Sequence, residues 1–357
     1  MHTQSLCRHM SGTFQIVRHC IVNVLFSLVV LLGACDNSSD DPAPPAPPVV
    51  CKLTHQTTNG TLTNTNGTTT QNRTSTYTYD QNGNILGVSV NNKYEYSDGN
   101  KEITSSSFAY TYDDDGFLVR RVSHDTRSNK DGLTSSQMTD AIFEYKDQRL
   151  SQVNHTQTYN GTTITYSHMY EYDSEGRLIK FSSTNKDYTK FEYTGNRIQR
   201  ITYVDAAGNS RSPFIEYNAN GQLVKSIDVE DGITKERRYQ YNAAGDLIRD
   251  ELYYNGKPYV GYTYEFDDKI NPGAASNSRP KGHPEFPGIQ AYTGQKHNIT
   301  KIVYFGGKGD AWAEGSTVVN TYQYNANNVP VEKISKSSDF GIQYASELTS
   351  FQYQDCN

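Results

Sequence analysis

Residues that could carry out catalysis or bind a metal ion are scattered through this chain. Six histidines follow residue 50, and none has a histidine, cysteine or carboxylate partner at the spacing of a metal site; they are His55, His124, His155, His168, His283 and His297. The sequence contains neither a His-Glu-x-x-His zinc motif nor a Gly-x-Ser-x-Gly nucleophile elbow. We therefore expect no metal ion, no cofactor and no nucleophilic catalytic residue.

Two glycine-containing loops have some features of ligand sites. The run Phe305-Gly306-Gly307-Lys308-Gly309-Asp310 lacks the spacing of a phosphate-binding loop and precedes no helical pattern. The run Asp113-Asp114-Asp115-Gly116 lacks the glutamate that a calcium loop places six residues after its glycine, because position 122 is valine. We therefore expect both runs to form hairpin turns. Carboxylates that converge from separate turns into a glycosidase site stay open as an alternative.

The N-terminus carries the one clear signal for covalent chemistry. Arg8 and Arg18 precede an apolar run over residues 21–32, which is followed by Gly33, Ala34 and Cys35. The run is shorter than the roughly 20 residues of a membrane span. This pattern resembles the lipobox of bacterial lipoproteins, which implies that residues 1–34 are a signal peptide and that Cys35 is lipidated. An ordinary secretory signal or a membrane span are the alternatives.

Residues 35–50 then form a tether. Acidic residues follow Cys35, and a proline-rich run over residues 42–48 favours extended polyproline II. The acidic cluster resembles surface-export signals of Bacteroidota lipoproteins. The resemblance implies a lipid-anchored protein of the cell envelope, at the outer membrane and exposed at the surface.

The charge of the chain excludes one class of partner. The net charge is −6, and removing residues 1–34, which carry Arg8 and Arg18 but no acid, makes the remainder more acidic still. Neutralising phosphates requires clustered Lys and Arg, so we expect no nucleic-acid partner. The lipid on Cys35 is the expected contact with the membrane.

A tyrosine-rich repeat dominates residues 51–357, which we take as one domain. Its pattern is Tyr-x-Tyr-Asp-x-x-Gly-x-Leu; clear copies begin at Tyr77, Tyr110, Tyr170, Ile215 and Tyr239, and weaker copies at Tyr94, Phe143, Phe191, Tyr262 and Tyr322. Aromatic residues two apart share one face of a strand. The Asp starts a type I turn, and the Gly supplies the left-handed bulge residue. Each copy is therefore a β-hairpin.

About ten hairpins in series predict an all-β antiparallel meander of about 20 strands, curled into a soluble barrel or near-barrel. We expect the inner face to carry Tyr79, Tyr112, Tyr172, Tyr217 and Tyr241. These rings are expected to pack against one another across the strands, and a role as sugar-stacking platforms is the alternative. The opposite face carries Glu171, Lys180, Arg238 and Gln240 and therefore cannot contact hydrocarbon.

The repeat is similar to the YD repeats of Rhs proteins and teneurins over residues 75–335. Together with the lipobox and the run Asp267-Asp268-Lys269-Ile270-Asn271-Pro272, it resembles a family of Bacteroidota lipoproteins of unknown function with a porin-like fold. Gly273 stands where that family has a bulky residue. The resemblance implies a fold and no chemistry.

Three further features carry predictions. Residues 267–297 lack periodicity, and we expect either a lid or plug over the curled sheet or a merely decorative loop. Trp312 is a candidate ligand-stacking residue, with buried packing as the alternative. Cys51 and Cys356 remain after the signal peptide and lipid account for the other cysteines, so we expect a disulfide that joins the first and last strands, against two free thiols as the alternative.

Two classes of function remain. The first is a non-enzymatic envelope lipoprotein, either a structural module or one that binds a glycan or peptide. The second is a glycan-active hydrolase whose carboxylates are assembled from turns. The missing nucleophile and metal motifs favour the first.

Overall fold

A computed structural model describes residues 51–64, 67–195, 197–271, 280–284, 296–339 and 342–354. The lipobox, Cys35, the tether and Cys356 lie outside the described residues. Within the described ranges, twenty-one β-strands follow one another, which confirms the predicted all-β meander. Among the described residues, no helix has the length and apolar character of a membrane span.

The strands fall into three groups by length. The first eight are long: β1 (Lys52–Asn64), β2 (Gly67–Tyr79), β3 (Ile85–Tyr96), β4 (Lys101–Tyr112), β5 (Leu118–Asn129), β6 (Gly132–Lys146), β7 (Arg149–Tyr159) and β8 (Thr162–Tyr172). The next eight are short: β9 (Leu178–Ser183), β10 (Tyr188–Thr194), β11 (Arg197–Val204), β12 (Ser210–Arg211), β13 (Phe214–Tyr217), β14 (Leu223–Glu230), β15 (Ile233–Tyr241) and β16 (Leu247–Tyr254). The last five are long again: β17 (Lys257–Ile270), β18 (His297–Lys308), β19 (Ala311–Tyr324), β20 (Pro330–Asp339) and β21 (Ile342–Gln354).

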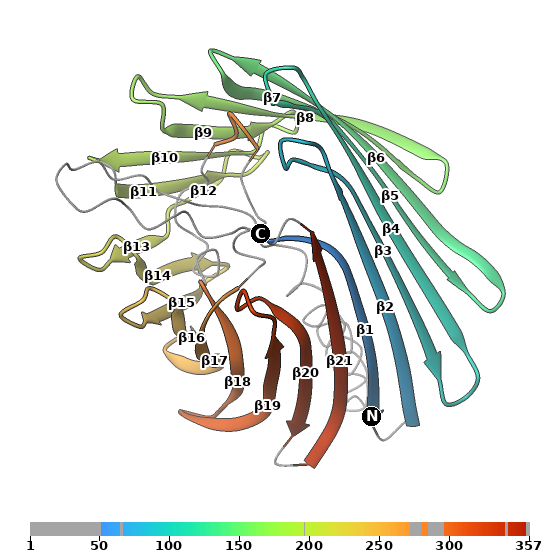
Figure 1. The fold of residues 1–357 in the computed structure, drawn as a ribbon. Coiled ribbons are helices and arrows are strands. Elements are labelled where there is room, and N and C mark those ends of the chain that lie inside the picture. Colours follow the sequence, from blue (N-terminus) through green and yellow to red (C-terminus); the bar gives the residue numbers. More distant parts are fainter. Residues whose placement is uncertain are drawn as a thin grey trace, which may run out of the picture.

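The strands form one antiparallel sheet that curls into a near-barrel (Figure 1). β1 pairs with β21 from Lys52 opposite Gln354 to Leu62 opposite Ala345, so the first and last described strands lie side by side. Within the described ladders, the break falls between β12 and β13, because β12 pairs only with β11 and β13 only with β14. The gap is therefore in the middle of the sequence and not at the chain ends.

Side chains hold the two edges of this gap together. Arg211 on β12 forms ion pairs with Asp228 and Glu230 on β14. Ile215 and Tyr217 on β13 pack against a cluster of buried residues on the other side, namely Leu178, Phe191, Ile198 and Ile201. Pro213 lies between the two strands and has no N–H to continue a ladder.

The repeat turns have the predicted geometry. In the copy around Asp173, Oδ1 accepts hydrogen bonds from the N–H groups of Glu175 and Arg177 at 3.0 and 2.9 Å. Gly176 follows with φ +85°, and the ladder shifts register between Glu171 and Tyr172. These are the marks of a type I turn with a G1 bulge.

One weak copy and one boundary differ from prediction. The copy that begins at Tyr262 forms no turn, and β17 continues to Ile270; Glu265 and Asp268 stand where the clear copies have Asp or Asn and the turn glycine. The end of β17 contains Asp267–Ile270, whereas the sequence predicts that these residues belong to the irregular stretch, and β18 begins at His297.

The buried core consists of three apolar clusters that lie near the repeat turns. The first contains Leu118, Ala141, Phe143, Leu150 and Val153, the second is the cluster beside the gap, and the third contains Leu223, Tyr239, Leu247 and Tyr264. Four of the five tyrosines expected on the inner face pack against these clusters, namely Tyr112, Tyr172, Tyr217 and Tyr241.

A ladder of tyrosine hydroxyls connects successive hairpins. Seven tyrosines at strand ends donate hydrogen bonds of 2.8 to 3.0 Å to the carbonyl oxygen of a residue at the start of the preceding strand; they are Tyr79, Tyr145, Tyr172, Tyr193, Tyr241, Tyr322 and Tyr353. Burial raises the pKa of Tyr79 to about 12, so its hydroxyl remains a donor across the physiological range. The repeated tyrosines therefore have the packing role that we expected.

Candidate functional site

The long strands β3–β6 extend their inner face well beyond the first apolar cluster. Tyr110, which packs on that cluster, lies opposite Arg121. Because side chains alternate along a strand, Arg127 on β5 lies on the same face as Arg121, and Glu102 on β4 lies on the same face as Tyr110. Strand register thus places Glu102 and Arg127 on the inner face.

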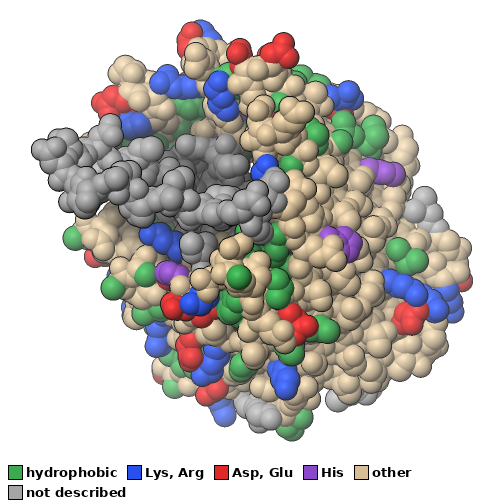
Figure 2. Space-filling view, in the orientation of Figure 1, with side chains coloured by type: hydrophobic (Ala, Val, Ile, Leu, Met, Phe, Trp, Pro, Cys, Tyr) green, Lys and Arg blue, Asp and Glu red, His purple; other side chains and the backbone are tan. Residues whose placement is uncertain are grey.

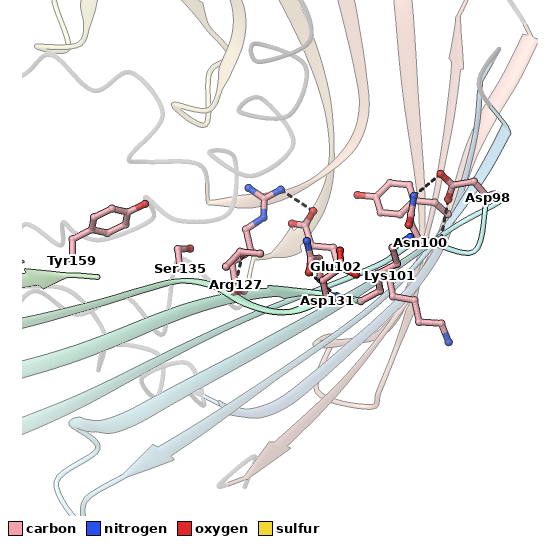
Figure 3. Close-up of a pocket in the computed structure, with 12 residues that line it drawn as sticks. Asp98, Asn100, Lys101, Glu102, Arg127, Asp131, Ser135 and Tyr159 are labelled. Atoms are coloured by element: carbon pink, nitrogen blue, oxygen red, sulfur yellow. Dashed lines mark hydrogen bonds and ion pairs between the residues drawn. The ribbon is translucent and has the colours of Figure 1, made fainter. Parts of the chain in front are cut away.

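A groove occupies this end of the inner face. It has a volume of about 680 Å³ and is lined by Tyr96, Asp98, Asn100, Lys101, Glu102, Arg127, Asn129, Lys130, Asp131, Thr134, Ser135 and Tyr159. In Figure 3 the side chains of Tyr159, Arg127 and Glu102 lie on the side of the strands that faces the enclosed space, whereas that of Lys101 points the other way. The residues come from β3 to β7 and from the turns between them.

Arg127 and Glu102 form the charged centre of the groove. Nη2 of Arg127 donates to Oε2 of Glu102 at 2.8 Å, and 60 % of the arginine side chain is exposed, against 21 % for the glutamate. Much of the guanidinium edge is thus available for a second acceptor. At the other side, Asn100 Nδ2 donates to Asp98 Oδ2 at 2.6 Å.

Two tyrosines bound the groove. Tyr159 on β7 is 52 % exposed. Burial and then the negative charge of Glu102 raise the pKa of Tyr96, so its hydroxyl stays protonated. The groove thus combines aromatic faces, amides, hydroxyls and several charged side chains, a set of groups that can bind a polar ligand by stacking and hydrogen bonds.

Trp312 lies apart from this groove, on β19. Its ring packs against Gly261, where an added Cβ would lie 3.4 Å from the indole, and it meets Tyr253 edge-on with ring centroids 5.5 Å apart. The hydroxyl of Tyr253 donates to Glu251 at 3.0 Å. These contacts describe a packed, half-buried ring, and its candidate role in ligand stacking stays a prediction.

Only one of the two cysteines of the predicted disulfide lies within the described residues. Cys51 is 3 % exposed. Lys52 and Gln354 are opposite each other at the paired ends of β1 and β21, as the predicted bridge requires. Cys356 lies outside the described residues, so its pairing with Cys51 stays a prediction.

The irregular stretch is fastened where it leaves and re-enters the sheet. Near its start, Asp267 accepts hydrogen bonds from the Lys269 N–H and from the Tyr324 hydroxyl. At its end, Asp246, which is completely buried, accepts from the Lys296 N–H at 2.8 Å and pairs with His297 Nδ1 at 2.7 Å. Burial opposes the charge on Asp246, but these hydrogen bonds hold its pKa below the ordinary value.

Residues 280–284 form a third point of attachment, on the turns at the ends of β4 to β7. The carbonyl of Gly282 accepts a hydrogen bond from the Leu150 N–H at 2.8 Å, and His283 Nε2 lies 2.9 Å from the Tyr145 hydroxyl. Lys281 Nζ lies 4.4 Å from the centre of the Phe117 ring. Residues 272–279 and 285–295 lie outside the described residues, so the lid or plug stays a prediction.

Sequence reasoning did not find the groove residues. Tyr96 belongs to a weak repeat copy, but Glu102 and Arg127 lie in polar strands whose register the sequence does not state. Across the described ranges, no group of three or more His, Cys, Asp or Glu residues is arranged to hold a metal ion.

No protein-family model matches the chain, and no curated protein matches it. Among solved structures, it is similar to a porin-like protein from Bacteroides uniformis, with 11 % identity, a TM-score of 0.35, and coverage of 85 % of this chain and 96 % of that one. A porin-like protein from Bacteroides vulgatus matches at 11 % identity and a TM-score of 0.25, over 85 % of this chain and 99 % of that one. The TcdB2–TccC3 structure without its hypervariable C-terminal region matches at 9 % identity and a TM-score of 0.20, over 80 % of this chain and 21 % of that one.

Proposed function

We propose that this protein is an envelope lipoprotein, built from YD-type hairpins, that binds a glycan on the inner face of its near-barrel. The observation that carries the proposal is the groove of about 680 Å³ on the long strands, bounded by Tyr96 and Tyr159 and centred on the pair of Arg127 and Glu102. Tyrosine rings offer flat apolar faces to a sugar ring, and the polar groups between them offer donors and acceptors to its hydroxyls.

The proposal is tested with the fragment of residues 50–357, which contains every described strand. It is screened on a glycan array and, in parallel, on a panel of glycosidase substrates. We expect binding without turnover. Release of a product from any substrate would favour the hydrolase, and a blank array would overturn glycan binding.

Matched tyrosine variants locate the site. Tyr159→Ala removes a groove ring and is expected to weaken binding at least tenfold. Tyr259→Ala removes a ring of the same 52 % exposure outside the groove and is expected to leave binding unchanged. Equal losses in the two variants would place the glycan elsewhere.

The membrane anchor is proposed from the apolar run that ends in Leu32-Gly33-Ala34-Cys35. Cys35→Ala should leave the precursor uncut or release the protein from membranes. Fractionation of the variant with membranes in a processed form would contradict a lipid anchor at Cys35.

The disulfide between Cys51 and Cys356 is proposed from the burial of Cys51 and the pairing of β1 with β21. The mature domain is denatured without reductant and treated with a thiol label. No labelled cysteine is expected at these two positions, and labelling at both would show that the bridge does not form.

A further inference from the structure

The charged centre of the groove presents a hydrogen-bond donor and an acceptor side by side. Arg127 on β5 donates through Nη2 to Oε2 of Glu102 on β4 at 2.8 Å. This bond engages one of the five guanidinium N–H groups and one of the two carboxylate oxygens. Because the arginine side chain is 60 % exposed, groups of both kinds remain available to a ligand.

The ionisable side chains around the groove leave an excess of negative charge on the inner face. Three carboxylates and three cations line it, namely Asp98, Glu102 and Asp131, and Lys101, Arg127 and Lys130. Lys101 points to the opposite side of the sheet (Figure 3), where it pairs with Glu95 at 3.0 Å. Three carboxylates therefore stand against two cations, and Arg127 is already paired with Glu102.

The Tyr96 hydroxyl lies in the field of these charges. Burial contributes most to its raised pKa, and the negative charge of Glu102 then raises the pKa more than the positive charge of Arg127 lowers it. A hydrogen bond with Glu102 and the charge of Asp98 raise the pKa further. The electrostatic potential at this side of the groove is therefore negative.

The hydroxyl groups of a neutral sugar match this arrangement. A hydroxyl both donates and accepts, so one hydroxyl can donate to Glu102 while its neighbour on the sugar ring accepts from Arg127. Hydrogen bonds to charged groups are stronger than those between neutral groups. The ring of Tyr159, which is 52 % exposed, offers a flat apolar face to the same sugar.

The carboxylate of an acidic sugar does not match it. To reach Arg127 with two parallel hydrogen bonds, the ligand must displace Glu102, which is only 21 % exposed and would lose its counter-charge. A ligand carboxylate that left the pair intact would instead lie close to Glu102, Asp98 and Asp131. It would be repelled, because like charges this close together raise the free energy of the complex.

From this arrangement we propose that the groove binds a neutral glycan and rejects acidic ones, with the pair of Arg127 and Glu102 recognising two neighbouring hydroxyls of one sugar residue. The inference rests on the proposed glycan function and adds the substrate class. Glu102 is the residue that determines this specificity, because it holds Arg127 and repels a second carboxylate.

The outer face of the sheet provides a matched control. Arg120 and Asp140 form a pair at 2.7 Å, and their side chains are 52 % and 24 % exposed, close to the 60 % and 21 % of Arg127 and Glu102. Asp140 precedes Ala141, which is buried in the first apolar cluster, so Asp140 projects from the opposite face. Neutralising Glu102 or Asp140 changes the net charge of the protein by the same amount.

The experiment titrates the fragment of residues 50–357 calorimetrically with linear trimers of glucose, galactose and mannose and with the trimers of the corresponding uronic acids. We expect at least one neutral trimer to bind, and its acidic partner to bind at least tenfold more weakly. Glu102→Gln should narrow this preference at least fivefold, and Arg127→Gln should weaken binding of the neutral trimer at least tenfold. Asp140→Asn should change neither value, and thermal melts confirm that each variant folds.

Three outcomes would overturn the inference. If an acidic trimer bound as tightly as its neutral partner, or more tightly, the groove would not reject acidic sugars, although glycan binding itself would stand. If Asp140→Asn narrowed the preference as much as Glu102→Gln, the preference would come from the overall charge of the protein. If no trimer bound, the substrate class would be rejected, whereas the proposed function falls only if the glycan array is blank as well.

Discussion

The short strands β9–β16 and the long strands β1–β8 are built from the same hairpin repeat, but a larger part of each short strand is buried. Strands β9–β16 have at most nine residues, and apolar clusters cover much of their inner face. Strands β1–β8 have 11 to 15 residues, and their apolar cluster lies near the turns. Beyond the cluster these strands carry mostly Thr, Ser and Asn, and the side of the molecule that they form shows few charges in Figure 2.

This difference separates the packed part of the sheet from the groove on which the proposed binding rests. Near the turns, most hairpins contribute an apolar residue, an aromatic pair and a tyrosine hydroxyl bond, and these contacts hold the sheet. The length that β3–β7 add beyond the core is not needed for burial. It therefore leaves an inner surface on which polar and charged groups can contact a ligand.

The largest expected effect is loss of core packing in the region of short strands. Leu247 is 1 % exposed, and Leu247→Ala should lower the free energy of unfolding by about 2–5 kcal/mol. Ile103→Ala on the long strand β4, where the side chain is 43 % exposed, should change it by less than about 0.5 kcal/mol. Urea unfolding measures both, and equal effects would contradict the division between the two regions.

A turn glycine provides the next test. Gly176 has φ +85°, and an added Cβ would lie 2.3 Å from Nη2 of Arg149. Gly176→Val should destabilise the protein by about 3 kcal/mol, through backbone strain and displacement of Arg149. Gly116 has φ +83° and no atom within 4 Å of its added Cβ, so Gly116→Val measures the backbone strain alone. If Gly116→Val lowered the free energy of unfolding as much as Gly176→Val, displacement of Arg149 would contribute nothing to the destabilisation.

His155 reverses the usual sign of a core substitution. His155→Phe removes two buried ring nitrogens that have no hydrogen-bond partner within the described part of the chain, and it should stabilise the protein by about 1–3 kcal/mol at pH 7, measured by urea unfolding. Burial lowers the folded pKa to about 4, below the ordinary 6.5, so the unfolded chain takes up the proton first. The wild type should therefore lose stability as the pH falls from about 6.5 to 4. The His155→Phe variant should lose less stability over this pH range. An identical pH profile for both proteins would show that His155 does not cause the loss.

The smallest expected effect concerns the tyrosine ladder. Tyr172→Phe removes the hydroxyl that donates to the Leu150 carbonyl at 2.8 Å and should cost about 1 kcal/mol. Tyr79→Phe removes the equivalent bond to Leu53 in the polar region. Similar losses of thermal stability in the two variants would show that the ladder works alike in both regions, and a loss confined to Tyr172 would limit it to the apolar one.

The local sequence determined the hairpins. Asp173 and Gly176 specify their turn through contacts within five residues, and alternation specifies which side chains share a face, so the all-β meander and the tyrosine packing were predictable. In the copy that begins at Tyr262, Glu265 and Asp268 replace the usual Asp or Asn and Gly of the turn, and the strand continues instead.

The tertiary structure decided what depends on strands far apart in the sequence. The pairing of β1 with β21 and the break between β12 and β13 follow from how the whole sheet curls, which no single hairpin encodes. The groove exists because the ladders of β3 to β7 bring Tyr96, Glu102, Arg127 and Tyr159 together. A shift of one residue in any of those ladders would turn a side chain to the opposite face, and the turns and packed core on which the register depends lie outside the site itself.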